Sequence, residues 1–132
     1  MPWTNPKTNW TSNEAYNFGD INRVESNMEY VRSELIGIGY TVPSLTFITN
    51  RNILSYDLLS SVNRIESNME AIKLFTPPGW LDTITWTADT RFTNYHANRW
   101  ESNVQLLHDY VPLVESAFRR CGATVAGQGV PI

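Results

Sequence analysis

The residues best suited to acid–base chemistry in this chain are three glutamates, each set in the same short polar motif. Glu25, Glu66 and Glu101 lie in Asn-Arg-x-Glu-Ser-Asn, where x is Val, Ile or Trp. Carboxylates can act as general acids, and the arginine near each of these glutamates would offset its negative charge. The three could form a carboxylate ring if the units pack about a pseudo-threefold axis. Acid catalysis also needs a pocket, for which a small helical bundle has little room, so we expect no catalytic residue and no enzyme.

The motif has five polar positions that are identical in all three copies, which start 41 and 35 residues apart. An internal repeat has to be recognised first, because it determines how the whole fold is interpreted. Besides the serines, the repeated polar residues are Asn22, Arg23, Glu25, Asn27, Asn63, Arg64, Glu66, Asn68, Asn98, Arg99, Glu101 and Asn103.

Two interpretations of these polar residues compete. The arginine and glutamate of a motif are two positions apart, so they do not face each other on their own helix and their partners must lie elsewhere. In the structural interpretation, each pair fastens its helix to the extended segment of its own or a neighbouring unit, and the asparagines bind loop backbone. In the functional one, three equivalent polar sites are presented to partner chains or to a glycan. We favour the structural interpretation.

Other chemistry has little support in the sequence. His96 and His108 are read as helix-surface residues, and the single cysteine, Cys121, allows no intrachain disulfide. Phosphate-loop, zinc and nucleophile-elbow motifs are missing, so we expect no cofactor and no metal. The net charge of -3, without a cluster of basic residues, argues against a nucleic-acid partner. No stretch is long and apolar enough for a membrane span, and we expect synthesis in the cytoplasm.

The spacing of apolar residues predicts a mainly α protein. Apolar residues recur three and four positions apart around each motif, which is typical of one face of an amphipathic helix. We therefore expect three helical repeats packed as a small bundle, each helix preceded by a short extended segment. The β-prone runs at 45–49 and 83–87 are candidates for a small sheet.

The expected boundaries follow from caps, glycines and prolines. Asn17 is a good N-cap, and Pro112 should kink the third helix or start a new one. The expected parts are an N-terminal extended arm at 1–16, a helical domain at 17–120 with helices at about 18–36, 56–75 and 94–120, and a flexible C-terminal tail at 121–132.

Five tryptophans are many for 132 residues. Aligning the copies upstream of the motif places Ile48 where the other two units have a tryptophan, with three extra residues in the second unit. A position that accepts isoleucine suits packing, so we expect Trp10, Ile48, Trp86 and Trp100 to be packing anchors. Trp3 and Trp80 lie outside the repeat and are candidate partner contacts.

The motifs resemble a family of small tail-associated proteins of phages and prophages of Gram-positive bacteria. The resemblance is carried by 7–11 (Lys-Thr-Asn-Trp-Thr), 16–18 (Tyr-Asn-Phe) and 20–27 (Asp-Ile-Asn-Arg-Val-Glu-Ser-Asn), and by their recurrence in the third unit. It spans about 6–120, and members of this kind end in a short glycine-containing tail. The second unit departs from the pattern at Ile48.

This resemblance implies a non-enzymatic structural protein of the virion tail. Such a protein links the tail or baseplate to fibres or forms part of the host-recognition complex. Its partners would be other virion or tail proteins, in multiple copies within a symmetric assembly. The alternatives are a module that binds host cell-wall carbohydrate and a head or decoration protein.

Overall fold

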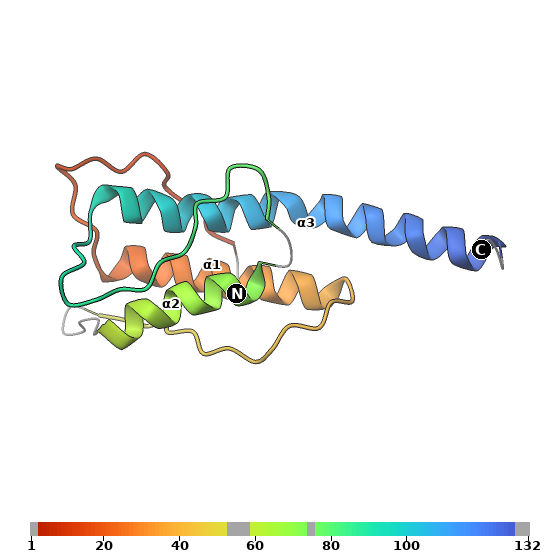
Figure 1. Ribbon diagram of the computed structural model, residues 1–132, viewed down its shortest axis with the longest axis horizontal. Coiled ribbons are helices and arrows are strands. Elements are labelled where there is room, and N and C mark those ends of the chain that lie inside the picture. The colour runs from red at the N-terminus through yellow and green to blue at the C-terminus, as the bar shows by residue number, and fades with distance from the viewer. Residues whose placement is uncertain (1–2, 53–58, 74–75, 129–132) are drawn as a thin grey trace.

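The computed structural model describes residues 3–52, 59–73 and 76–128, with side chains given up to Ala117. It contains three helices, α1 (Phe18–Gly37), α2 (Leu59–Ile72) and α3 (Asn94–Gln128). All three run in the same direction, and the chain returns between them along the outside of the bundle (Figure 1). The expected mainly α bundle is confirmed. The described residues contain no β-strand, so the small sheet is not formed there.

The start of α1 follows from its capping residues. The Asn17 side chain accepts hydrogen bonds from the backbone N–H groups of Gly19 and Asp20, at 3.0 and 3.4 Å. The Asp20 carboxylate in turn accepts a 2.9 Å hydrogen bond from the backbone N–H of Asn17, which completes a capping box. At the other end, Gly39 has a positive φ of 106°, which a residue with a Cβ rarely adopts. The sequence-based prediction of α1 is therefore correct to within one residue.

The predicted third helix differs from the observed one. α3 does not restart at Pro112 but contains this proline and continues as one helix to Gln128. The predicted end of this helix at about 120 is therefore wrong, because 121–128 are helical, while 129–132 lie outside the described residues. A proline removes only one donor from the backbone ladder, and the helix carries on beyond that gap. For the second helix, the predicted ends at 56–58 and 74–75 lie outside the described residues.

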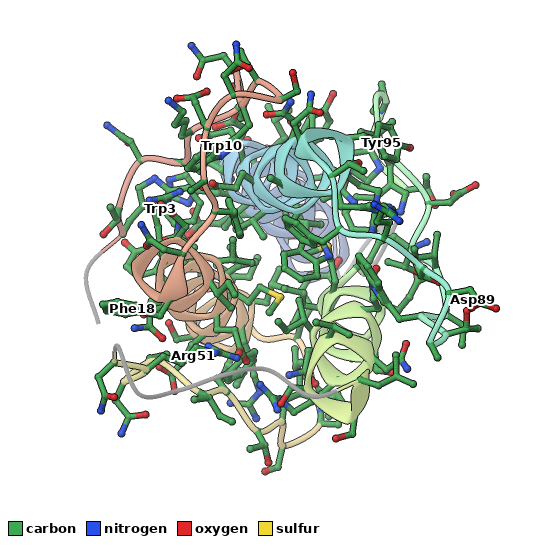
Figure 2. The ribbon with its side chains drawn as sticks, turned by 90° about the vertical axis from the view of Figure 1, so that its left-hand side faces the viewer. Trp3, Trp10, Phe18, Arg51, Asp89 and Tyr95 are labelled. Carbon is green, nitrogen blue, oxygen red and sulfur yellow. The ribbon has the colours of Figure 1, made fainter. Side chains whose placement is uncertain are left out.

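Three extended segments, at 3–10, 45–51 and 80–86, run beside the helices. The first lies over α1 and α3, as the labels of Trp3 and Trp10 show in Figure 2, and Arg51 marks the second beside α1 and α2. The N-terminal part, predicted as an extended arm, is thus docked on its own bundle from Trp3 onwards. Its backbone is held by side chains of the repeated motif, as described below.

The core lies between the helices, in layers built from equivalent positions of the three motifs. Its residues are apolar, and those in the three central layers are 0 to 4% exposed. The layers are Val24, Ile65 and Trp100, then Met28, Met69 and Val104, then Val31, Ile72 and Leu107. Full burial of such a side chain contributes about 1.5–3 kcal/mol. Within the described ranges, no helix is apolar over a length that could cross a bilayer.

Candidate functional site

The glutamate of each motif is buried, and it binds the arginine of the next helix around the bundle. The exposed fractions of the three glutamates are only 0, 3 and 1%. The pairs form a closed cycle, hereafter the Arg–Glu ring: Arg64 of α2 to Glu25 of α1, Arg99 of α3 to Glu66 of α2, and Arg23 of α1 to Glu101 of α3. The last pair joins the first unit to the third and so closes the cycle.

Glu66 shows how a buried carboxylate is satisfied. Arg99 binds it with two bonds, Nη1 to Oε1 at 2.7 Å and Nη2 to Oε2 at 2.6 Å. The indole N–H groups of Trp86 and Trp100 donate to Oε2 at 2.6 and 2.9 Å. Burial acts to raise the pKa of Glu66, but the bonds from Arg99, Trp86 and Trp100 outweigh it and leave the pKa lowered. The carboxylate is thus held ionised, whereas a general acid at neutral pH needs a raised pKa.

Glu101 has a similar set of partners: an arginine, one indole and a backbone N–H group. Arg23 binds it through Nε, at 2.8 Å from Oε1, and through Nη2. The Trp10 indole donates at 2.8 Å, and the backbone N–H of Lys7 donates at 3.1 Å. One helix, the next helix and the first extended segment therefore meet at a single carboxylate.

At Glu25 the place of the indole is taken by a guanidinium. Arg51 donates through Nη2 to Oε2, Arg64 donates to the same oxygen at 2.7 Å, and the backbone N–H of Ile48 donates to Oε1 at 3.1 Å. Arg51 is 7% exposed, much like Trp10 and Trp86 at 8 and 5%. The residue equivalent to the two tryptophans is therefore Arg51.

The prediction of Ile48 as the anchor of the second unit is corrected by this geometry. Arg51 precedes its motif asparagine by twelve positions, as Trp10 and Trp86 precede theirs, so no insertion is needed. Ile48 is half-buried and contributes its backbone N–H. An indole and a guanidinium share what this position requires, an N–H donor at the end of a long side chain. Matching by hydrophobicity missed this, whereas counting residues back from the motif would have found it.

The first asparagine of each motif binds both backbone groups of an anchor residue. Asn63 accepts from the N–H of Trp86 at 2.7 Å and donates to its carbonyl at 3.2 Å. Asn98 likewise accepts from the N–H of Trp10 at 2.7 Å and donates to its carbonyl at 3.0 Å. The third such pair is Asn22 with Arg51, at 3.0 Å for both bonds. In every case the asparagine holds the segment that precedes the next helix around the ring.

The second asparagine of each motif holds the segment that leads into its own helix. Asn27 accepts from the N–H of Thr4 at 3.0 Å and donates to its carbonyl at 2.7 Å. Asn103 binds Leu81 with the same two distances. The third contact is the bond from Asn68 to the carbonyl of Thr46 at 2.8 Å. Each extended segment thus lies in a groove between two helices and is bound to both of them.

These contacts are of the kind that the structural interpretation of the motif describes. The asparagine amides hold loop backbone, and the glutamates bind extended segments, as that interpretation has it. Each arginine, however, binds the glutamate of a neighbouring helix and not an extended segment. The backbone of Thr4, Thr46 and Leu81 was not identified from the sequence, because a bond to a backbone group does not depend on residue type.

The remaining tryptophans take part in packing. Trp100 is fully buried, and its indole reaches Glu66. Trp3 and Trp80, predicted as partner contacts, are half-buried and pack against the core. Trp3 stacks on His108 with ring centroids 3.9 Å apart, because the first segment lies across α1 and α3.

Two hollows lie near the start of the helices. One, of about 340 Å³, lies between residues 10–16 and the start of α3 and includes Trp10, Tyr16 and Phe92 in its lining. The other, of about 290 Å³, is lined by Tyr16, Ile21, Val62, Phe92 and Trp100. Among the described residues, no three His, Cys, Asp or Glu side chains gather as metal ligands would.

The histidines have local partners. His96 lies 3.1 Å from Nη2 of Arg99, and burial together with this cation lowers its pKa. His108 pairs with Glu34 at 2.9 Å.

Comparison with known proteins gives no match: no family model, no curated protein and no solved structure is significantly similar to this chain.

The role of Arg51 is tested by two substitutions. Arg51→Trp keeps an N–H donor at the position and is expected to change the free energy of unfolding by less than about 1 kcal/mol. Arg51→Leu removes a hydrogen bond to the buried carboxylate of Glu25 and should lower the free energy of unfolding by about 1.5–3 kcal/mol. Denaturant unfolding of both variants measures this. Equal losses in the two would show that Arg51 is not equivalent to the tryptophans.

The lowered pKa of Glu66 makes the free energy of unfolding depend on pH. The pKa of Glu66 in the folded protein is below the ordinary 4.5. Its contribution to the free energy of unfolding is therefore complete above pH 4.5 and is lost as the pH falls through the pKa of the folded protein. Glu66→Gln should cost about 3 kcal/mol at pH 7, because Arg99 is left unpaired. The difference in the free energy of unfolding between Glu66→Gln and the unchanged protein should become steadily smaller below about pH 4.5.

The matched control is Glu70→Gln, which alters an exposed glutamate of the same helix. Its ion pair with Lys73 lies at the surface and should contribute little. Unfolding curves between pH 7 and pH 3 provide the measurement. A loss of unfolding free energy in Glu66→Gln that stays the same from pH 7 to pH 3 would show that Glu66 does not have a lowered pKa.

Proposed function

We propose that this protein is a non-enzymatic structural component of a phage or phage-like tail. In this role it links the tail or baseplate to fibres or forms part of the host-recognition complex. The tail assignment rests on the motif resemblance at 7–11, 16–18 and 20–27. The structural role is supported by one observation, the closed Arg–Glu ring. Its buried carboxylates are bound by arginine, by indole or guanidinium groups, and by backbone N–H groups.

The way the motif is used supports a scaffold. A binding or catalytic site needs polar groups that can reach a ligand, whereas these bind the helices and segments of their own chain. The result is a body with three helices and three extended segments fastened at equivalent points. Such a body can present its outer surfaces to neighbouring subunits without rearranging, which suits an adaptor.

The partners in this proposal are other virion or tail proteins, with several copies of the chain in a symmetric assembly. The surface is compatible with protein neighbours, since only 17% of the residues are charged and charged residues are depleted in the centre of protein interfaces. The chain would be made in the host cytoplasm and incorporated into the tail.

Locating the protein in particles tests the proposal. Particles from the host that encodes this chain would be separated into tails and heads, and each fraction analysed by mass spectrometry. The chain should be enriched in tails, and an antibody against it should label the tail end in electron micrographs. Recovery only in heads, or absence from particles, would contradict the proposal.

A further inference from the structure

The larger of the two hollows near the start of the helices, about 340 Å³ in volume, is hereafter the α3 hollow. It lies beside Trp10, at the end of the molecule that faces the viewer in Figure 2. Residues 10–16 line one side of it, and residues 92–97, which include the first turn of α3, line the other. Its volume is at the lower end of the roughly 300–1,000 Å³ found for small-molecule sites. The α3 hollow therefore has room for one compact ligand.

The apolar part of its lining consists mainly of three aromatic rings. Tyr16 lies between Trp10 and Phe92, with its ring centroid 4.9 Å from the first and 5.2 Å from the second. Phe92 is 38% exposed, so a ligand can reach its ring. An aromatic ring has a negative face, which attracts the slightly positive hydrogens of C–H groups. This part of the hollow therefore suits a ligand with a flat C–H surface.

The polar part of the lining is neutral. Among the described residues that line the hollow there is no lysine or arginine, and the one carboxylate is Glu14. Glu14 already pairs with Lys7 and accepts hydrogen bonds from the N–H and the hydroxyl of Thr11. The remaining polar groups include the Ser12 hydroxyl and the Asn94 amide, which can each donate and accept. An anion would find no cation in this lining, and a cation would have to displace Lys7 from Glu14.

The repeated motif holds the wall of the hollow in place. Both backbone groups of Trp10 are bound by Asn98, and its indole donates to the buried carboxylate of Glu101. The position of Trp10 is therefore set before any ligand arrives. A preformed wall reduces the conformational entropy that binding would cost.

We propose that the α3 hollow binds one neutral pyranose sugar. A pyranose has a face of C–H groups, which matches the rings of Tyr16 and Phe92, and a rim of hydroxyl groups, which matches the neutral donors and acceptors of Ser12 and Asn94. The inference deepens the host-recognition part of the proposed function and rests on it for its biological context. In that context the ligand is a sugar residue of a glycan on the host surface.

NMR titration of the full chain tests the proposal. The probes are glucose, galactose, mannose and their N-acetylamino forms. At least one should bind with a Kd of about 1 mM, as expected for a ligand of this size. Binding should shift the methyl signal of Ala97, which lines the α3 hollow. The methyl signals of Ile21 and Val62, which line the other hollow, should stay unchanged.

Two variants locate the contacts with the sugar. Phe92→Leu keeps an apolar side chain but removes the ring face, and Asn94→Ala removes the amide. Each should weaken binding about fivefold. The matched control is Phe18→Leu, because Phe18 at the start of α1 is 40% exposed, much like Phe92, and does not line the hollow. The control should bind as the unchanged chain does, and melting temperatures show that each variant is folded.

Three results would overturn the proposal. They are an unchanged Ala97 signal at about 50 mM of every sugar, well above the expected Kd, shifts at Ile21 and Val62 instead, and equal binding by Phe92→Leu and the unchanged chain. The test is separate from that of the tail assignment. A chain found only in heads would contradict the tail assignment and leave the sugar site intact, whereas a tail protein that binds none of these sugars would contradict only the sugar site.

Discussion

The constraint on which this structure depends is the burial of three carboxylates. Removing a charged group from water costs several kcal/mol unless the protein supplies a complete set of donors. Here the donors come from three different parts of the chain: the arginine of the next helix, the anchor residue of an extended segment, and a backbone N–H at Ile48, Ile84 or Lys7. Each carboxylate can be buried only when all three parts are in place. The polar motif therefore specifies a cyclic order of helices and segments, which apolar packing alone would not do.

This constraint also explains why three helices can lie parallel. Parallel neighbours need long connections that return to the starting end, and a returning segment must find partners for its backbone groups. The asparagines provide them, with one binding the segment before its own helix and one binding the segment before the next. The grooves of the bundle are thus filled by extended chain, and the described residues form a three-helix body without a β-strand.

Much of the fold could be predicted from the sequence, because the signals that define it are local. The capping residue Asn17, a first helix at about 18–36 and the apolar faces of the core all follow from spacing and residue type. Predictions failed where the physical requirement was not local. Arg51 fills the place of a tryptophan because Glu25 needs an N–H donor, and hydrophobicity does not reveal that need. Trp3 is a candidate partner contact in the sequence, whereas the three-dimensional course of the first segment places it on His108.

The candidate site could be predicted only in part for the same reason. The recurrence of the motif and the separation of its arginine and glutamate indicated contacts between elements, but not their direction around the bundle. The order in which the helices are paired is known only from the structure, where Arg23 binds Glu101 and so joins the first unit to the last. Pro112 shows the opposite limit, since its local tendency to end a helix did not prevent α3 from continuing to Gln128.

A double-mutant cycle on Arg23 and Glu101 is the most direct test of the closed ring. Unfolding free energies would be measured for Arg23→Leu, Glu101→Gln and the double variant, with the exposed surface pair Glu70 and Lys73 as the reference cycle. The account predicts a coupling of about 2 kcal/mol between Arg23 and Glu101 and less than about 1 kcal/mol for the exposed pair. A coupling between Arg23 and Glu101 no larger than that of the reference would contradict the claim that this contact closes the structure.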